Sequence, residues 1–301
     1  MEHVICLVSS SIEKPLDIGL LDKVVEFLEF NSIKPMGKPV YLEANKAADI
    51  FISQALDVEL LRDLRDMLDL YLTDVFCVPK EGRLKRLALF DMDSTIVAAE
   101  TLDEMAERAG FGEQVAVITK KAMEEGLDFD WSLRTRLKKL EGVNADELCA
   151  PTYADMQLNE GAESLIKTLN EFGTKTILVS GGFTYFTEKV SQRLGMDGHH
   201  GNVLEVDENG LLTGCVVNDD DIVNGERKAK YLEHYAAQFG IDVKDAYAMG
   251  DGSNDIAMMS LAGMGVGYHP ARGKKVEQEI VNIIRHGDLS CALYIMGISP
   301  E

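Results

Sequence analysis

The chain of 301 residues has few cysteines, little basic charge and no long apolar run, and each shortage excludes a class of protein. The five cysteines are scattered without a CxxC pair, which argues against a zinc site or a disulfide framework and favours buried, reduced thiols. No apolar stretch approaches the length of a membrane span, and the first residues lack the basic segment and apolar run of a secretion signal. These absences predict a cytoplasmic protein.

Basic residues are outnumbered, with 30 lysines and arginines against 51 acidic residues and a formal net charge of −21. Nucleic acid and anionic membrane surfaces would repel such a chain, so we expect neither as a partner. A small anionic substrate is not excluded, because it responds to the local charge of its site. The hydrophobic content of 46% is enough for a sizeable core, and the length predicts about two domains.

The first 80 residues have a pattern of predicted strands and helices that differs from the rest of the chain. Apolar patterning predicts the order βαββαβ of a ferredoxin-like sandwich, with strands at 4–9, 40–42, 48–52 and 74–78 and helices at 20–30 and 58–70. The proline, glycine and charges of Pro79–Arg83 predict a boundary, so this domain is expected to span residues 1–80. It contains no cluster of catalytic residue types.

The rest of the chain predicts an α/β core with an insertion. Four predicted helices occupy residues 99–159, and they interrupt a pattern in which strands alternate with helices. That alternation predicts a parallel sheet with right-handed crossovers, a Rossmann-like core formed by residues 84–98 and 160–301. A β-hairpin is expected within residues 203–217. The inserted helices would form a cap over the strand ends.

Polar side chains follow three predicted strands, in the segments Asp91–Thr95, Ser180–Gly182 and Gly250–Asp255. The carboxyl ends of parallel strands share one crevice, so these segments can converge although they are distant in sequence. Each also has a purely structural interpretation, because Asp and Ser cap helices and form Asx turns. Their joint occurrence at successive strand ends favours a catalytic site.

The residue types at these ends suit phosphate chemistry. Asp91 and Asp93 alternate onto one face, where paired carboxylates can serve as a nucleophile, an acid and base, or cation ligands. Asp251 could share a cation such as Mg²⁺ with Asp91. Ser180 and the glycines after it can approach an anion, and Lys228 could supply positive charge to a phosphoryl group, unless it is an ordinary solvated lysine.

The histidines carry a weaker signal. His199 and His200 follow one another in a segment that is predicted to be a polar turn, and no carboxylate pair is spaced to complete a metal site with them. We therefore expect solvated turn residues there rather than ligands.

These segments resemble the four signature motifs of the haloacid-dehalogenase-like phosphatases. Asp91–Thr95 is similar to their DxDxT motif, Ser180–Gly182 to the second, Lys228 to the third, and Gly250–Asp255 to the GDGxND fourth motif. Residues 85–298 further resemble phosphoserine phosphatases, through the segments 91–100, 119–123, 132–136 and 179–184. The N-terminal part is similar in element order to ACT-like domains.

The resemblance implies a covalent mechanism. Asp91 would attack phosphorus to form a phosphoaspartyl intermediate, and Asp93 would protonate the departing serine oxygen and then activate water. Mg²⁺ would bind the carboxylates of Asp91 and Asp251 and the main-chain carbonyl of Asp93. Asp255 would support the metal or Lys228. The phosphoryl oxygens would be held by Ser180, Gly181, Lys228 and Asn254.

The resemblance also implies where the substrate's amino-acid part would bind. Glu100 would take the ammonium, Arg136 the carboxylate, and Met123 and Phe129 would form an apolar wall. Without the family resemblance, Glu100 and Arg136 read as ordinary charges on helix surfaces.

The expected reaction is hydrolysis of O-phosphoserine, the last step of serine biosynthesis. The alternative is hydrolysis of, or transfer from, another small amine-bearing phosphomonoester. The N-terminal domain would then be an interaction or amino-acid-sensing module, with a homodimer as one outcome. The segment Ser9–Pro15 lacks the glycine-rich ligand turn of ACT-like domains, which favours interaction over sensing.

Overall fold

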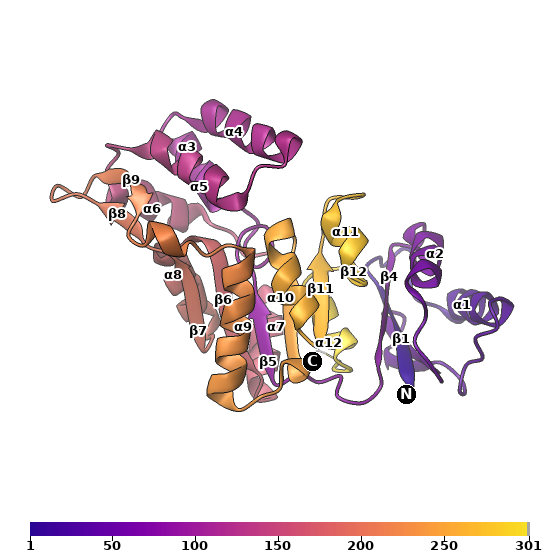
Figure 1. The fold of residues 1–301 in the computed structure, drawn as a ribbon. Coiled ribbons are helices and arrows are strands. Elements are labelled where there is room, and N and C mark those ends of the chain that lie inside the picture. Colours follow the sequence, from indigo (N-terminus) through magenta and orange to yellow (C-terminus); the bar gives the residue numbers. More distant parts are fainter. Residues whose placement is uncertain (300–301) are drawn as a thin grey trace.

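The computed structural model describes residues 1–299, apart from the side chains of residues 123 and 124. The N-terminal part is an antiparallel sheet in the order β2-β3-β1-β4, with two helices on one face (Figure 1). Its element order confirms the predicted βαββαβ pattern: β1 (His3–Ser9), α1 (Ile18–Phe30), β2 (Val40–Glu43), β3 (Ala47–Ile52), α2 (Val58–Asp69) and β4 (Thr73–Pro79).

Strand β1 is buried on both faces, which explains its unbroken apolar sequence. Ile5 and Leu7 pack with α1 and α2 in the core of the N-terminal part. Val4, Cys6 and Val8 point the other way and pack with the C-terminal helix α12 (Cys291–Ile295). Neighbouring strand residues alternate between faces, so one strand serves both cores. The N-terminal sheet is therefore packed against the rest of the molecule.

The larger sheet has six parallel strands in the order β12-β11-β10-β5-β6-β7. Strand β5 lies near its centre, between β10 and β6, although these strands are far apart in sequence. The strands are β5 (Leu87–Phe90), β6 (Lys175–Phe183), β7 (Gly198–Asn202), β10 (Ala246–Gly250), β11 (Met264–Tyr268) and β12 (Asn282–Ile284).

Helices cover both faces of this sheet. Leu87 and Leu89 of β5 pack in the cluster formed with α9 (Gly225–Phe239), α10 (Ile256–Leu261) and α11 (Lys275–Glu279). Ala88 and Phe90 pack in the cluster on the other face, with α7 (Ala162–Glu171), α8 (Thr184–Leu194) and α12. A parallel sheet that is covered on both faces confirms the predicted Rossmann-like core.

A helical insertion follows the carboxyl end of β5 and lies above one end of the large sheet (Figure 1). It contains α3 (Thr101–Arg108), α4 (Gly112–Glu125), α5 (Phe129–Leu137), the 3₁₀ turn η1 (Lys138–Leu140) and α6 (Ala145–Asp155). The predicted hairpin, β8 (Leu204–Val206) and β9 (Leu212–Val216), contacts it, since the Leu212 N–H donates to the Val143 carbonyl at 2.8 Å. The cap is thus tied to the core at more than its two chain connections.

Two polar segments expected in turns lie in strands instead. Strand β6 continues past Val179 through Ser180–Gly182, and its pairing with β7 becomes irregular there. His199 and His200 lie in the edge strand β7, so their placement in a solvated turn was wrong. His200 stacks on Tyr231, and this packing across elements could not be read from the histidines themselves.

Three short 3₁₀ turns complete the described chain: η2 (Asp219–Asp221), η3 (Val243–Asp245) and η4 (Ser253–Asp255). Across residues 1–299, no helix combines the length and apolar character that crossing a membrane requires.

Candidate active site

The three polar segments meet at one edge of the large sheet. Asp91 directly follows β5, Ser180 lies near the end of β6, and Asp251 directly follows β10. These three strands are adjacent and parallel, so their carboxyl ends point to the same edge. The expectation that distant segments converge there is confirmed by the sheet order.

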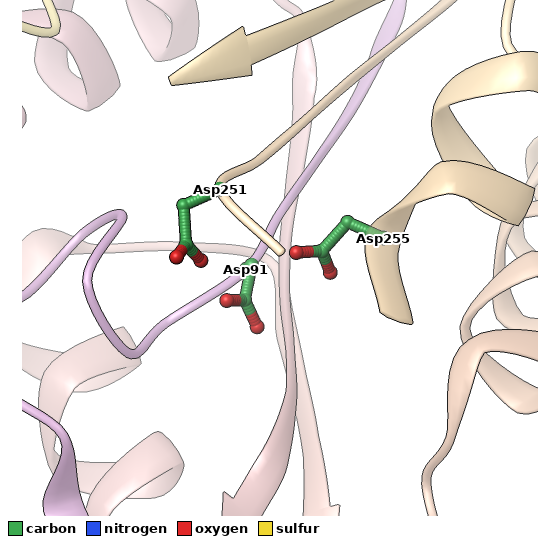
Figure 2. Close-up of side chains that lie close together, drawn as sticks. All are labelled: Asp91, Asp251 and Asp255. Atoms are coloured by element: carbon green, nitrogen blue, oxygen red, sulfur yellow. The ribbon is translucent and has the colours of Figure 1, made fainter. Parts of the chain in front are cut away.

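Three carboxylates form the centre of the site. Single oxygens of Asp91, Asp251 and Asp255 all lie within 4.8 Å of one another. The carboxylates of Asp251 and Asp255 both point toward that of Asp91 (Figure 2). Asp91 and Asp255 are buried and Asp251 is partly buried, so bulk water does little to screen their mutual repulsion.

Lys228 is the cation that the structure provides for these acids. Its side chain, on α9, is fully buried. Its Nζ donates to Asp91 Oδ1 and, at 2.6 Å, to Asp255 Oδ1. Burial alone would lower the pKa of Lys228, but the charges of Asp255 and Asp91 outweigh burial and raise this pKa above its usual value. The lysine therefore stays charged, and it is not a solvated helix residue.

One lysine does not neutralise three acids. Burial, followed by the charge of Asp255, raises the pKa of Asp91 well above its usual range, although Lys228 acts in the opposite direction. The same two causes, with Glu100, raise the pKa of Asp251 to about 7. This excess of buried negative charge fits a divalent cation, which carboxylate oxygens bind well. The cluster is accordingly a divalent-metal site.

Asp255 uses both of its oxygens within the protein. Oδ1 accepts from Lys228, and Oδ2 accepts from the Gly252 N–H at 3.1 Å. A Cβ on Gly250 would lie 2.3 Å from the Asp255 carboxyl carbon, so only glycine leaves room for this carboxylate. These contacts suit Asp255 for holding the lysine and shaping the site, whereas the resemblance implies support of either the metal or Lys228.

Asp93 has a separate set of partners. Its Oδ2 accepts from Ser180 Oγ at 2.9 Å, and its Oδ1 accepts from the Thr101 N–H at 2.8 Å and from the Thr101 hydroxyl. The Ser180 hydroxyl in turn accepts from the Gly182 N–H at 2.7 Å. Thr101 was not singled out in the sequence. Its only signal there is a hydroxyl residue directly after Glu100, at a predicted helix start.

Glu100 lies at the start of the cap, where the charge of Asp93 affects it. It is the residue that precedes α3, and its Oε1 accepts from Ser94 Oγ at 2.8 Å. Partial enclosure, followed by the charge of Asp93, raises the pKa of Glu100 to about 7, although the side chain keeps contact with solvent. The nearby Arg136 acts to lower this pKa, while its own Nη1 lies 3.3 Å from Asp103 Oδ1. Asp103, another residue that the sequence did not single out, thus holds Arg136.

Of the remaining predicted residues, Phe129 and Asn254 have surroundings that the structure describes. Phe129, on the cap helix α5, lies directly over Gly181, since a Cβ on that glycine would be 2.3 Å from the ring. Asn254 belongs to the turn η4, which packs closely against Gly225 at the start of α9. The side chain of Met123 lies outside the described residues. Through the contact of Phe129 with Gly181, the cap meets the core above the segment Ser180–Gly182.

Residues 88–260 match the haloacid dehalogenase-like hydrolases, so the chain belongs to this family. A phosphoserine phosphatase of Polaromonas sp. is 43% identical over 205 residues, which cover 67% of this chain and 86% of that protein. One from Archaeoglobus fulgidus is 38% identical over 209 residues, which cover 69% of this chain but only 58% of that protein. Over its full length the fold is similar to a haloacid-dehalogenase-family hydrolase from Salmonella enterica serovar Typhi, with a TM-score of 0.83, 27% identity and 98% of both chains covered.

Proposed function

We propose that this protein hydrolyses O-phosphoserine to serine and phosphate, as the last step of serine biosynthesis. The observation that supports it most is the pairing of Asp91 with the buried Lys228, beside an Asp93 that has its own hydrogen bonds. This arrangement gives two neighbouring carboxylates different partners and therefore different tasks. The relatives from Polaromonas sp. and Archaeoglobus fulgidus carry the name of this activity.

In the proposed mechanism, Asp91 is the nucleophile. Its carboxylate attacks phosphorus while the bond to the seryl oxygen breaks, and a phosphoaspartyl intermediate forms. Asp93 gives a proton to the departing oxygen and later accepts one from the water that cleaves the intermediate. Lys228, already directed at Asp91 Oδ1, would stabilise negative charge on the transferring phosphoryl group.

We assign a Mg²⁺ ion to the carboxylate cluster, held by Asp91, Asp251 and the main-chain carbonyl of Asp93. Bound there, the ion would offset the repulsion between Asp91 and a phosphate dianion. Asp251 suits this role because its carboxylate faces Asp91 (Figure 2). Both oxygens of Asp255, in contrast, already accept hydrogen bonds.

The phosphoryl oxygens would be held by Ser180, the Gly181 N–H, Lys228 and Asn254. The amino-acid part would lie under the cap, with its ammonium on Glu100 and its carboxylate on Arg136. Phe129, over Gly181, would close the apolar side of this space together with Met123. Arg136 would have to exchange or share its contact with Asp103 when it binds the substrate.

A panel of small phosphomonoesters tests the activity. Purified protein with Mg²⁺ should give its highest kcat/KM on phosphoserine, above phosphothreonine, phosphoethanolamine and glycerol phosphate. Product analysis with added homoserine separates hydrolysis from transfer to another alcohol. A clear preference for a substrate without the ammonium or the carboxylate would contradict the assignment.

For the whole chain we propose residues 1–80 as an ACT-like interaction domain, 99–159 as the cap, and 84–98 with 160–301 as the catalytic core of a cytoplasmic enzyme. The N-terminal part could join two copies, because β2 is an edge strand and Val40 on it is exposed. The mass in solution tests this. A dimer that Val40→Lys dissociates would support pairing through β2, and a monomer would refute it.

A further inference from the structure

The two oxygens of Asp93 are held from opposite sides of the site. Ser180, in the core, donates to Oδ2, while Thr101, the first residue of the cap helix α3, donates to Oδ1 through both its N–H and its hydroxyl. Asp93 is partly buried, and both Ser180 and Thr101 are buried. The carboxylate therefore bridges the cap and the core.

The contacts of Asp93 with Ser180 and with Thr101 should respond differently when a phosphoryl group binds. Ser180 has a single hydroxyl proton, which it now gives to Asp93 Oδ2, and its oxygen accepts from the Gly182 N–H. A phosphoryl oxygen that takes this proton frees Oδ2. Nothing in the proposed binding of the phosphoryl group competes for Thr101, so Oδ1 keeps both of its donors.

The Thr101 N–H has no acceptor inside its own helix. It belongs to the first turn of α3, where N–H groups lack intrahelical partners, and Asp93 supplies the acceptor. The positive end of the helix also favours a carboxylate at this place. Asp93 thus stabilises the start of the cap helix, and the cap helix fixes the orientation of Asp93.

We propose that Thr101 is a positioning residue, which anchors Oδ1 of Asp93 so that Oδ2 is the oxygen that exchanges the proton. This inference rests on the proposed phosphatase function. In the first half-reaction, Oδ2–H gives its proton to the seryl oxygen as the P–O bond breaks and the bond from Asp91 to phosphorus forms. In the second, Oδ2 takes a proton from water as the water oxygen bonds to phosphorus and the bond to Asp91 breaks.

The experiment compares leaving groups, because a good leaving group needs no proton. Thr101→Val removes the hydroxyl at nearly constant volume and keeps the N–H. We expect kcat/KM for phosphoserine to fall roughly 10- to 100-fold, as for a misplaced acid. With p-nitrophenyl phosphate or acetyl phosphate, whichever the wild type cleaves faster, kcat/KM should change by less than about twofold. Thr101→Ser, which restores the hydroxyl, should recover most of the loss.

The matched control is Thr152→Val in the cap helix α6. Thr152 is also buried, but its hydroxyl donates only to the Leu148 carbonyl of its own helix, so both substrates should be unaffected. Equal losses on both substrates, or no loss with Thr101→Val, would overturn the proposal. Thr101→Ala gives the same comparison if the valine variant fails to fold.

A failure of the proposed function would appear in the substrate preference of the wild type and not in the comparison of variants. If the wild type cleaved another alkyl phosphate better than phosphoserine, the same comparison on that ester against the activated phosphate would still test Thr101.

Discussion

At the scale of single residues, the contact between Asp91 and Lys228 carries the proposed chemistry. Asp91→Asn removes the nucleophile and should lower kcat by about 10⁴-fold or more, with no phosphoenzyme trapped after acid quench. The metal-free variant should nevertheless melt no lower than the wild type, because a buried carboxylate with a raised pKa is removed and Lys228 keeps Asp255. Full turnover in this variant would refute the mechanism, and exposed Asp63→Asn serves as its control.

The charge of the cluster also predicts how stability depends on pH and metal. Burial and neighbouring carboxylates raise the pKa of Asp251 and of Glu100, from 3.8 and 4.5, to about 7 in each case. Between the unfolded pKa values of 3.8 and 4.5 and the folded value of about 7, the folded protein therefore binds more protons than the unfolded chain. The free energy of unfolding of the metal-free protein should therefore fall as pH rises through this window.

Magnesium should reverse this trend, because it binds the ionised carboxylates. Melting temperatures measured in chelator and in excess Mg²⁺ should differ more at about pH 7.5 than at about pH 5. Asp251→Asn should remove most of that difference. An equal Mg²⁺ effect at both pH values, or a metal-free protein that is most stable at the higher pH, would contradict the placement of the cation.

At the scale of elements, the ends of β5, β6 and β10 build the site, and their glycines make the close contacts possible. Gly250→Ala would force the new Cβ against the Asp255 carboxylate, which Lys228 holds in place. We expect a loss of about 1–3 kcal/mol in the free energy of unfolding, together with weaker Mg²⁺ binding. Denaturant unfolding and metal titration measure the two effects.

Gly19→Ala is the matched control for Gly250→Ala. It lies in α1, where the nearest atom to an added Cβ is a side-chain oxygen of Asp17 at 3.4 Å, which is ordinary contact. Alanine also favours helix over glycine by about 0.5–1 kcal/mol, so this variant should be neutral or slightly stabilised. A Gly250→Ala protein as stable as Gly19→Ala would show that the contact with Asp255 is not restrictive.

The elements also show how far the sequence could predict the fold. The strand predicted before Asp91 is present as β5 (Leu87–Phe90), because burial on both faces leaves an unbroken apolar segment that ends in a polar turn. The pair His199–His200 was misread. A short edge strand with little apolar sequence takes its structure from its partner β6 and from Tyr231, and neither is visible in the local pattern.

The candidate site shows the same limit. Sequence motifs identified Asp91, Asp251 and Lys228. The sheet order brings the two aspartates together, and helix α9 carries Lys228 to Asp91. The motifs did not identify Thr101, because its role comes from where the N–H of the first turn of α3 points in three dimensions. Residues that position a catalytic group through another contact leave little trace in spacing.

At the scale of the whole molecule, the N-terminal sheet and the catalytic core share one packed interface. Arg83, in the connecting segment, is almost buried and binds Asp49 of β3 through two nitrogens, at 2.5 and 3.2 Å. It also donates to the carbonyls of Tyr294 and Ile295 at 2.9 and 3.0 Å. The guanidinium thus joins the N-terminal sheet, the connecting segment and the end of α12.

This interface predicts that the two parts unfold together. Removing residues 1–80 would expose the apolar side chains of α12 that pack against β1, so the isolated core should be less stable and prone to aggregate. The full chain should show one cooperative transition by calorimetry and by denaturant. Arg83→Met should cost about 3–5 kcal/mol, since it leaves Asp49 buried without its cation.

The exposed pair of Lys80 and Glu2 provides the comparison that isolates this effect. Both side chains are close to half exposed, at 48% and 43%, although the pair also links the connecting segment to the N-terminal strand. Lys80→Met should therefore change the free energy of unfolding by less than about 1 kcal/mol. If Arg83→Met were equally mild, or if the wild type melted in two separate steps, the N-terminal part would be an independent module. If instead the two transitions separate only in the Arg83→Met variant, the buried pair of Arg83 and Asp49 couples the two parts. The interface with the core leaves the edge strand β2 unpaired on one side, which is the side open to a second copy.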